Sequence, residues 1–321
     1  MIISKTPFRV PFAGGLSDLP AYAHRFGGVT VSSTIDKYVY IGVKRNVDGY
    51  INLKYMDVHE KVTSVEDVRH DLIREALYMT GLETEPLDVY IMVDLNSESG
   101  LGSSGAVTVG LLNAMHAYKS EAVEAVKLFE EAAHIEVENL GNASGYHDPA
   151  ISALGGLKLI EYDADGIDSR PISIGERFKQ EFQDSLLFFY TGRHYKSKPS
   201  LDLLASHMDD ALETVGEMKQ NAYDLAEAFA HSDLAGVSRA IQAQQDLKQK
   251  LPGKFTDEYV EDVVRRAQKH GAGVQLPGGK IGAFLMVCCP DGQQAAVRGE
   301  FKEFREVSLG LSDPGSAVIE M

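Results

Sequence analysis

Residues 94–115 read DLNSESGLGSSGAVTVGLLNAM, and this stretch decides how the rest of the chain is interpreted. Before it, apolar side chains alternate at Val89, Ile91 and Val93, which is typical of a half-buried strand. After it, a nearly continuous apolar run that begins near Gly105 predicts a largely buried helix. The serines and glycines in between can bring backbone N–H groups close to an anion at the positive end of that helix. They also fit a plain turn that caps a core helix, so other parts of the chain must decide between the two.

The composition of the 321 residues is that of an ordinary globular protein, with 44% hydrophobic and 24% charged residues. The length suits two domains. The net charge of −16 and the lack of any basic run argue against nucleic-acid binding. Such a chain also repels phosphates at long range, so a phosphate site would need local dipoles, Mg²⁺ and a few well-placed basic side chains.

The sequence shows no sign of a membrane segment or of a disulfide framework. No apolar run reaches the ~18–20 residues of a membrane span, and the first ten residues lack the apolar region of a signal peptide. The two cysteines, Cys288 and Cys289, are adjacent and follow an apolar run, so we expect them in a buried strand. A cytoplasmic location is the default expectation.

The N-terminal half alternates strand patterns with helix patterns. Strands are expected at residues 28–35, 37–46, 50–56 and 157–162, with turns near Asp36 and at residues 46–50. Helices are expected at residues 19–26, 64–80 and 120–141. Pro20 suits the first turn of the first helix, Ser64 is the expected N-terminal cap of the second, and Gly141 ends the third.

A change in composition at residues 163–177 marks the predicted boundary between two domains, residues 1–163 and 164–321. The second half opens with a strand pattern at residues 184–193 and returns to strand-rich sequence at residues 271–290. Helices are expected at residues 200–231, 234–250, 257–270 and 293–301, before a final strand at residues 303–309.

Two carboxylates outside the central stretch are candidates for chemistry. Glu136 lies on the same helical face as apolar neighbours such as Ala133 and Leu140, so it is either a surface residue at the rim of that face or a buried ligand. Asp148 precedes Pro149, a pair that suits the start of a helix. Capping and chemistry are compatible there, because a carboxylate at a helix start is also rigidly held.

A cationic loop stands out in the second half of this acidic chain. It reads RHYKSKPS and contains Arg193, His194, Lys196 and Lys198. The loop is either simply solvated or a binding site for a phosphate group, and its charge alone does not distinguish these alternatives.

Three separated stretches, in the right order, resemble the motifs of the GHMP kinases. SGLGSSGA at residues 99–106 resembles the phosphate loop of that family, and TPFRVPFAGGLSDLP at residues 6–20 resembles its N-terminal motif. PGGKIGAF at residues 277–284 is similar to a degenerate form of its third, glycine-rich motif, with Lys280 in place of a glycine. The resemblance implies an α+β, two-domain fold, with a ribosomal protein S5 domain 2-like N-terminal domain and a ferredoxin-like C-terminal domain. It also implies an active site in the cleft between them.

Within the family, the chain is most similar to the sugar-1-kinases that act on D-glycero-D-manno-heptose 7-phosphate. The similarity lies in FAGGLSDLPAY, GYHDPAISALGG and YTGRHYKS, although Pro149 stands where that branch usually has Gln. It implies ATP- and Mg²⁺-dependent formation of heptose 1,7-bisphosphate, for the activated heptose of capsule, S-layer or lipopolysaccharide. ATP and a sugar phosphate would be the binding partners, with no nucleic acid and no membrane, and a homodimer is left open. The alternatives are a kinase for unphosphorylated fucose, mannose or galactose, and a non-catalytic sugar or nucleotide sensor.

The resemblance also assigns roles to single residues. Asp148 and Arg9 fall on the catalytic pair, and Asp148 would either remove the proton of the acceptor hydroxyl or only orient that hydroxyl. Ser104 and Glu136 fall on the Mg²⁺ ligands. The residues implied in nucleotide binding are Ser97, Ser99, Gly100, Leu101, Gly102, Ser103 and Ser104. The residues implied in substrate binding are Gly14, Gly15, Ser17, Asp18, His147, Thr191, Gly192, Arg193 and Lys196. Arg25, Lys37 and Arg45 are alternative ligands for a phosphate on the acceptor.

Overall fold

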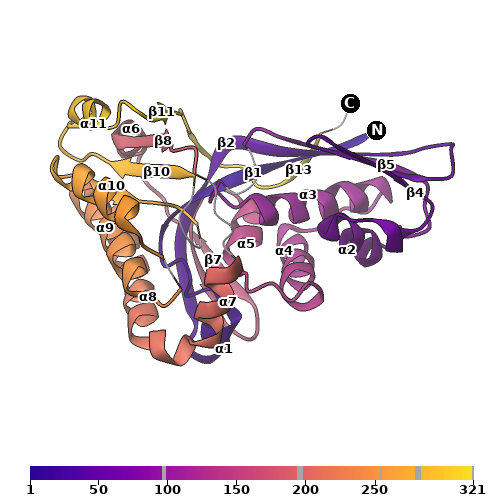
Figure 1. The fold of residues 1–321 in the computed structure, drawn as a ribbon, viewed down its shortest axis with the longest axis horizontal. Coiled ribbons are helices and arrows are strands. Elements are labelled where there is room, and N and C mark those ends of the chain that lie inside the picture. Colours follow the sequence, from indigo (N-terminus) through magenta and orange to yellow (C-terminus); the bar gives the residue numbers. More distant parts are fainter. Residues whose placement is uncertain (96–98, 194–197, 254, 279–282, 320–321) are drawn as a thin grey trace.

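Two β-sheets with their covering helices make up the fold. The computed structural model describes residues 1–95, 99–193, 198–253, 255–278 and 283–319 (Figure 1). The larger sheet contains β1 (Ile2–Ala13), β2 (Gly28–Arg45), β3 (Ile51–Tyr55), β4 (Val58–Val62), β5 (Leu87–Val93), β6 (Leu157–Tyr162), β7 (Ile167–Pro171), β12 (Leu311–Ser312) and β13 (Ala317–Ile319). The smaller sheet is antiparallel, in the order β11 (Arg305–Glu306), β8 (Leu186–Tyr190), β10 (Phe284–Cys288) and β9 (Gly273–Gln275). The α+β class expected from the sequence is confirmed.

The predicted turn at Asp36 is wrong, because residues 28–45 form one continuous strand, β2. The N-terminal part of β2 pairs with β6 up to Ser33, and its C-terminal part pairs with β5 from Val39 onward. Asp36 lies where the partner changes, and there its backbone and carboxylate bind the backbone of Gly310. Asp36 is thus a polar residue at the point where β2 changes its neighbouring strand, and in the sequence such a residue resembles a turn.

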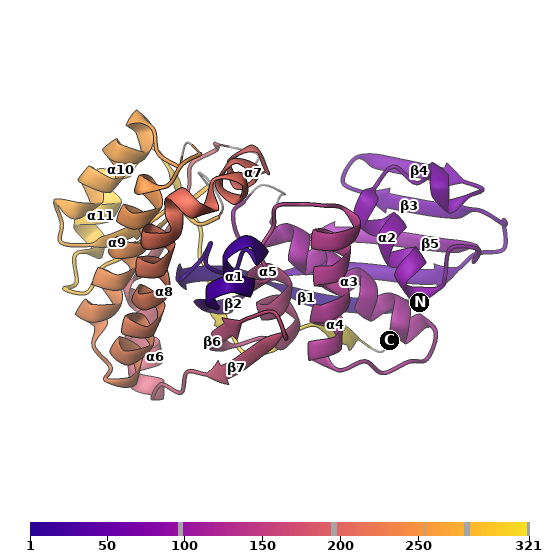
Figure 2. The ribbon, with the colours of Figure 1, turned by 90° about the horizontal axis from the view of Figure 1, so that it is seen from below.

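The helix predicted after the central stretch is confirmed as α3 (Ser103–Tyr118). Its residues from Gly105 to His116 are all buried. β1 and β2 pack against one side of α3, and α2 (Asp71–Thr80), α4 (Ala125–Ala133) and α5 (His147–Leu154) pack against the rest (Figures 1 and 2). A helix that is surrounded in this way can be apolar on every face.

Three predicted helices have different bounds in the structure. The helix expected at residues 200–231 is two helices, Lys198–Ser206 and Met208–Ala230, separated at His207. The helix expected at residues 64–80 begins only at Asp71, with His70 as its N-cap, and Ser64 precedes a short 3₁₀ turn (Val65–Asp67). Glu60 accepts the backbone N–H of Arg69 and holds the preceding residues out of the helix. The helix expected at residues 120–141 is α4 followed by a π-helical turn (His134–Asn139).

The helices of the second half pack against both sheets and against one another (Figure 2). Those described are α6 (Glu176–Ser185), α7 (Lys198–Ser206), α8 (Met208–Ala230), α9 (Leu234–Lys250), α10 (Glu258–Gln268) and α11 (Gln294–Glu300), and α1 (Pro20–Phe26) lies near α8. Of these, α6 was not predicted. Cys288 and Cys289 are buried and not disulfide-bonded, as expected. Within the residues described, every helix is too short or too polar to cross a membrane.

The larger sheet does not end at the predicted boundary near residue 163. β7 continues it from β6, and the C-terminal strands β12 and β13 return to pair with β2 and β1. The two ends of the chain therefore lie side by side, with Ile3 opposite Ile319 (Figure 1). The division into residues 1–163 and 164–321 stays a prediction, and the strand pairing does not follow a single cut in the chain.

Candidate functional site

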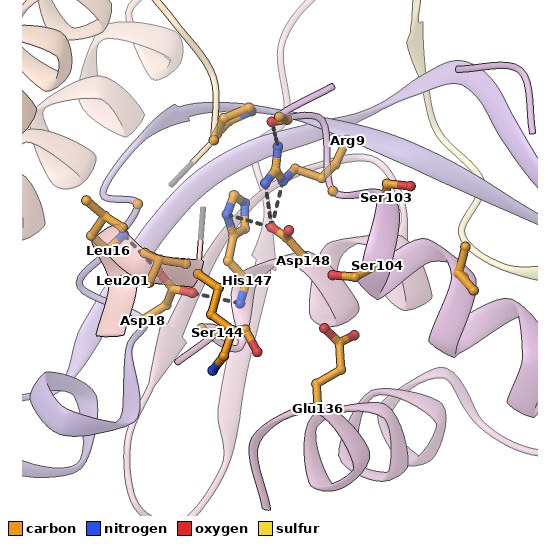
Figure 3. A pocket seen from close by; sticks show the side chains of 18 of the residues that line it. Arg9, Leu16, Asp18, Ser103, Ser104, Glu136, Ser144, His147, Asp148 and Leu201 are labelled. Carbon is orange, nitrogen blue, oxygen red and sulfur yellow. Dashed lines mark hydrogen bonds and ion pairs between the residues drawn. The ribbon is translucent and has the colours of Figure 1, made fainter. Parts of the chain in front are cut away.

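A cavity of about 540 Å³ collects most of the residues that the sequence singled out. It is lined by residues of β1, the turn before α1, the start of α3, the π-helical turn and the start of α5, together with residues of α7 and α9 (Figure 3). The predicted site residues on its wall are Arg9, Gly15, Asp18, Gly100, Gly102, Ser103, Ser104, Glu136, His147 and Asp148. The cavity thus draws on both halves of the sequence.

Arg9 and Asp148 form an ion pair in this cavity, although 139 positions separate them. Nε and Nη2 of Arg9 donate to Oδ1 of Asp148 at 2.8 and 2.6 Å, and Nη1 donates to the carbonyl of Gly100 at 2.7 Å. The Arg9 side chain is 5% exposed and that of Asp148 is 29% exposed. The carboxylate therefore faces the cavity while the guanidinium is fixed behind it.

The charge state of Asp148 follows from its surroundings. Burial disfavours its ionised form, but the positive charge and hydrogen bonds of Arg9 outweigh burial and lower its pKa below the usual value. In the neighbouring His147, burial and the charge of Arg9 both disfavour the charged imidazolium and lower the pKa to about 3. Near neutral pH the site therefore presents an ionised carboxylate beside a neutral imidazole, with His147 Nδ1 3.7 Å from Asp148 Oδ1.

The glycine-serine loop leads into α3 through a left-handed residue. Gly102 has φ of 81°, and a Cβ atom at this position would lie 2.8 Å from Cγ of Arg9. Ser103 and Ser104 line the cavity at the N-terminus of α3, where backbone N–H groups have no helical partner. Ser99 is buried beneath the loop, and its hydroxyl accepts the N–H of Leu101, which is also buried. Ser97 lies outside the described residues.

Glu136 is buried, which settles the question that its helix left open between a rim position and an interior one. It is 3% exposed, and its Oε1 accepts the hydroxyl of Thr108 at 2.9 Å. Burial raises its pKa to about 7, against the opposing hydrogen bonds of Thr108 and Ser104. A buried carboxylate next to a serine hydroxyl is a donor set that suits Mg²⁺, which commonly takes one or two carboxylates and otherwise phosphate and water oxygens.

Some of the predicted sugar-binding residues line the cavity, and others lie behind its wall and hold the turn before α1 in place. Asp18 lines the cavity, and its two carboxylate oxygens accept the N–H groups of Leu16 and His147, both at 2.9 Å. Burial raises the pKa of Asp18 to about 6. Ser17 is fully buried and donates to the carbonyls of Gly14 and Val29, so it shapes the turn.

The cationic loop is only partly described. The guanidinium of Arg193 stacks on the ring of Tyr259 at 3.7 Å, and Arg193 is not on the cavity wall. Thr191 donates its backbone N–H and its hydroxyl to the carbonyl of Ala283, next to Gly192 at φ of 71°. Lys198 does line the cavity. His194, Lys196 and Lys280 lie outside the described residues.

The structure adds cavity residues that the sequence did not single out. Lys248 and Gln244 come from α9, a helix that was predicted from the sequence without any candidate site residue. An apolar part of the wall comes from Tyr55, Leu72, Ile91 and Val93. No local signal marks these residues, because each lies in an ordinary helix or strand pattern and meets the cavity only after folding.

Comparison with known proteins finds similar sequences. Residues 68–156 match the family described as GHMP kinases N terminal domain. D-glycero-alpha-D-manno-heptose 7-phosphate kinase of Campylobacter jejuni is 22% identical over 299 residues, 88% of each chain. L-fucokinase/L-fucose-1-P guanylyltransferase of Bacteroides fragilis is 24% identical over 366 residues, and the match spans 99% of this chain but only 38% of that longer protein.

The fold has close counterparts among solved structures. That of a D-glycero-D-manno-heptose 1-phosphate kinase from Bacteroides thetaiotaomicron superposes with a TM-score of 0.82 at 22% identity, covering 100% of this chain and 99% of the other. This likeness shows the fold that the sequence motifs predicted. Residues 68–156 thus resemble the N-terminal domain of the GHMP kinases, and the whole chain shares the fold of the heptose 1-phosphate kinase structure.

Proposed function

We propose that the chain is an ATP- and Mg²⁺-dependent sugar kinase that phosphorylates the anomeric hydroxyl of D-glycero-D-manno-heptose 7-phosphate. The observation that carries the proposal is the Arg9–Asp148 pair, which shares one cavity with the N-terminus of α3 and the buried Glu136 (Figure 3). A phosphoryl donor held at the helix end would face an acceptor hydroxyl held at the carboxylate. The choice of sugar is supported by the heptose 7-phosphate kinase of C. jejuni, which is similar over 88% of this chain.

Asp148 would act on the acceptor hydroxyl. Its lowered pKa keeps it ionised, so it can accept a hydrogen bond from the hydroxyl or take its proton. An anomeric hydroxyl is more acidic than an ordinary alcohol, and a loose transition state lets the proton leave late. Arg9 would hold the carboxylate in place and stabilise negative charge on the transferring group.

The start of α3 and the apolar wall together suit a nucleotide. Backbone N–H groups at Ser103 and Ser104 would bind phosphate oxygens at the positive end of the helix. Tyr55, Ile91 and Val93 would pack against the nucleobase, since they line the same cavity and ligand sites are mostly apolar. Ser104 and Glu136 would hold Mg²⁺, which when bound neutralises charge on the β and γ phosphates.

A second candidate is a kinase for an unphosphorylated sugar. The B. fragilis fucokinase is similar over 99% of this chain. In addition, Arg193 stacks on Tyr259 away from the cavity wall, which weakens its predicted role toward a phosphate on the acceptor. Lys198 is the described cation of that loop that lines the cavity.

The test is to incubate the protein with Mg-ATP and a panel of acceptors and to follow products by ³¹P NMR. The panel contains D-glycero-D-manno-heptose 7-phosphate, sedoheptulose 7-phosphate, mannose, fucose and galactose. We expect a new anomeric phosphate on the heptose 7-phosphate at a rate far above the rates for the other sugars. Faster transfer to a neutral sugar would replace the heptose assignment, and absence of transfer to every acceptor would contradict a kinase.

A further inference from the structure

A polar face of α9 reaches into the site from the second half of the chain. Gln244 accepts the N–H of Gly14 at 2.8 Å and donates to the carbonyl of Gly15 at 3.2 Å. Gln245 accepts the N–H of Leu276 at 3.0 Å. One turn beyond Gln244 on the same helix lies Lys248. The two glutamines are thus used to hold backbone segments, and the lysine is the charged member of this face.

The ammonium of Lys248 is buried with an incomplete set of partners. The residue is 2% exposed, yet it lines the cavity. Nζ donates to the carbonyls of Leu276 and Gly278 at 2.5 and 3.1 Å. Among the residues that the structure describes, no carboxylate lies within ion-pair distance of it. An ammonium has three N–H donors, so one donor and the whole positive charge are left without a counterpart.

The position of Lys248 places this charge beside the phosphate loop. A Cβ atom on Gly278 would lie 2.9 Å from Cα of Gly100, so the backbones at these two glycines are in contact. Gly278 accepts from Lys248, and Gly100 accepts from Arg9. Lys248 and Arg9 therefore approach the glycine loop from opposite halves of the sequence, and Arg9 has a carboxylate partner whereas Lys248 has carbonyls.

We propose that Lys248 binds a phosphate oxygen of a substrate in the cavity and supplies the second cation of the site. A buried ammonium without an anion is costly, and a phosphate oxygen delivered by a ligand would complete both its charge and its third hydrogen bond. The identity of the ligand rests on the proposed kinase function. Either the terminal phosphate of the nucleotide or the phosphate of the acceptor has the required chemistry, and the experiment distinguishes them.

The charges around α9 give this contact a measurable signature. Burial and the positive charge of Arg9 lower the pKa of Lys248 to about 7. Of the elements packed against α9, β1 contributes Arg9, β9 has no ionisable side chain, and Glu217 on α8 pairs with Lys250. Asp18, Glu136, His147, Asp148 and Lys198 also line the cavity. Glu136, whose pKa is about 7, can also take up a proton when an anion binds, so the share of Lys248 is found by comparison with a variant that lacks it. Above pH 7 an anion bound at Lys248 raises its pKa, so binding takes up a proton.

The experiment is isothermal titration calorimetry at pH 8 in two buffers that differ in ionisation enthalpy. The wild-type protein is titrated without metal, in one arm with β,γ-imido-ATP and in the other with D-glycero-D-manno-heptose 7-phosphate. We expect uptake approaching about one proton per ligand in one arm. In Lys248→Met the uptake decreases by the share of Lys248, and the dissociation constant rises by about 10- to 100-fold, the loss typical of a charge-assisted hydrogen bond. Lys250→Met, at the exposed end of the same helix, keeps both values.

The two titrations distinguish the two possible phosphate ligands of Lys248. A proton uptake with the nucleotide analogue that decreases in Lys248→Met assigns Lys248 to the nucleotide phosphate, and the same decrease with the heptose phosphate assigns it to the acceptor. Wild-type protein that binds a ligand without proton uptake overturns the proposal, and this measurement does not depend on a variant that folds. Uptake of the same size in Lys248→Met and in the wild type overturns it as well. Binding of neither phosphate compound contradicts both proposals, whereas uptake without transfer to any acceptor contradicts the kinase alone.

Discussion

At the scale of single residues, burial sets the protonation states of the cavity. Asp18 and Glu136 have raised pKa values because burial disfavours their charge, whereas Arg9 lowers the pKa of Asp148 despite burial. Three carboxylates in one cavity therefore have different tasks, and only Asp148 is held ionised by a cation of the protein itself. This division leads to three predictions.

Asp148→Asn is expected to lower kcat by about 10²- to 10⁴-fold, because it removes the group that accepts or orients the hydroxyl proton. The KM for ATP should change only slightly, since Asp148 is not part of the phosphate loop. Steady-state kinetics with the preferred sugar measures both values. The matched control is Asp209→Asn, which breaks an exposed Arg–Asp pair with Arg25 at 2.7 Å and should leave kcat unchanged. Equal kcat values in the two variants would remove Asp148 from the mechanism.

Glu136→Gln is expected to raise the Mg²⁺ concentration required for half-maximal activity by at least about 10-fold, because a neutral amide is a poor ligand for a hard cation. The measurement is a Mg²⁺ titration of the initial rate at saturating ATP. Glu138→Gln is the control, because it changes an exposed glutamate of the same π-helical turn. A Mg²⁺ requirement that stays the same in Glu136→Gln would argue against Glu136 as a ligand.

Asp18 is expected to make the free energy of unfolding depend on pH. Its pKa in the folded protein is about 6, above the ordinary 3.8. Its stabilising contribution is therefore complete below about pH 4 and is lost as pH rises through 6, by about 3 kcal/mol for a shift of this size. Between pH 4.5 and 7.5, urea unfolding should show a loss that is about 2 kcal/mol larger in the wild type than in Asp18→Asn, because the contribution of Glu136, whose pKa is also raised, is lost in both proteins. Asp233→Asn, whose carboxylate accepts a backbone N–H at the surface, is the control. A loss of the same size in both variants would refute this account.

At the scale of elements, the packing between α3 and β1 depends on one small residue. Gly102 has both a left-handed backbone and no room for a Cβ atom beside the Arg9 side chain. The sequence pattern predicted a glycine turn at this point, but it did not show that the turn presses on Arg9. A substitution at Gly102 therefore has two separable effects, strain from the positive φ and a steric clash of the new Cβ atom with Arg9.

Gly102→Ala is expected to lower kcat at least about 10-fold, because the added methyl group displaces Arg9 by a few tenths of an ångström or more. It should also destabilise the fold by about 1 kcal/mol through the left-handed backbone. Gly81→Ala is the matched control, since Gly81 has φ of 67° with open space around it and should show only the loss of stability. Kinetics and urea unfolding of both variants give the comparison. Unchanged kcat in Gly102→Ala would mean that the position of Arg9 is not controlled by this contact.

The bounds of helices and strands were predicted well where apolar periodicity alone determines them and no distant contact shifts their ends. Strand β5, helix α3 and helix α9 follow the apolar periodicity of their own residues, so their sequences predicted them closely. The start of α2 was not predictable in this way, because a contact from Glu60 to the backbone of Arg69 delays it. The predicted turn at Asp36 failed for a similar reason, since a distant residue, Gly310, satisfies the polar groups there.

At the scale of the whole molecule, the C-terminal segment adds strands to the larger sheet, with β13 at its edge, and also contacts the helix that carries Asp148. Ser316 hydrogen-bonds to Thr6 and Asn113, and β13 pairs with β1. A Cβ atom on Gly315 would lie 2.1 Å from the carbonyl of Ala153 in α5. None of the residues of this segment lines the cavity.

Gly315→Ala is expected to destabilise the protein by about 1–3 kcal/mol, because the new Cβ atom would clash with the backbone of α5, which can move only if the helix shifts. Gly299→Ala is the control, because its Cβ would meet nothing within 4 Å. It should be neutral or slightly stabilising, as Gly299 lies in α11. Urea unfolding with both variants checks this. Equal stability of the two would show that the C-terminal segment is only loosely attached to α5.

The sequence by itself determined the α+β class, the order of the glycine motifs and the candidates Arg9, Glu136 and Asp148. Periodicity, glycine turns and a carboxylate among apolar neighbours are local properties, whereas Arg9 was assigned by the resemblance of its motif to that of the GHMP kinases. Only the tertiary structure decided that Glu136 is buried, that Arg9 pairs with Asp148, and that Lys248 reaches the same loop from α9. Those facts depend on contacts between residues far apart in the chain, and the free energy of burying a charge exists only after those contacts form.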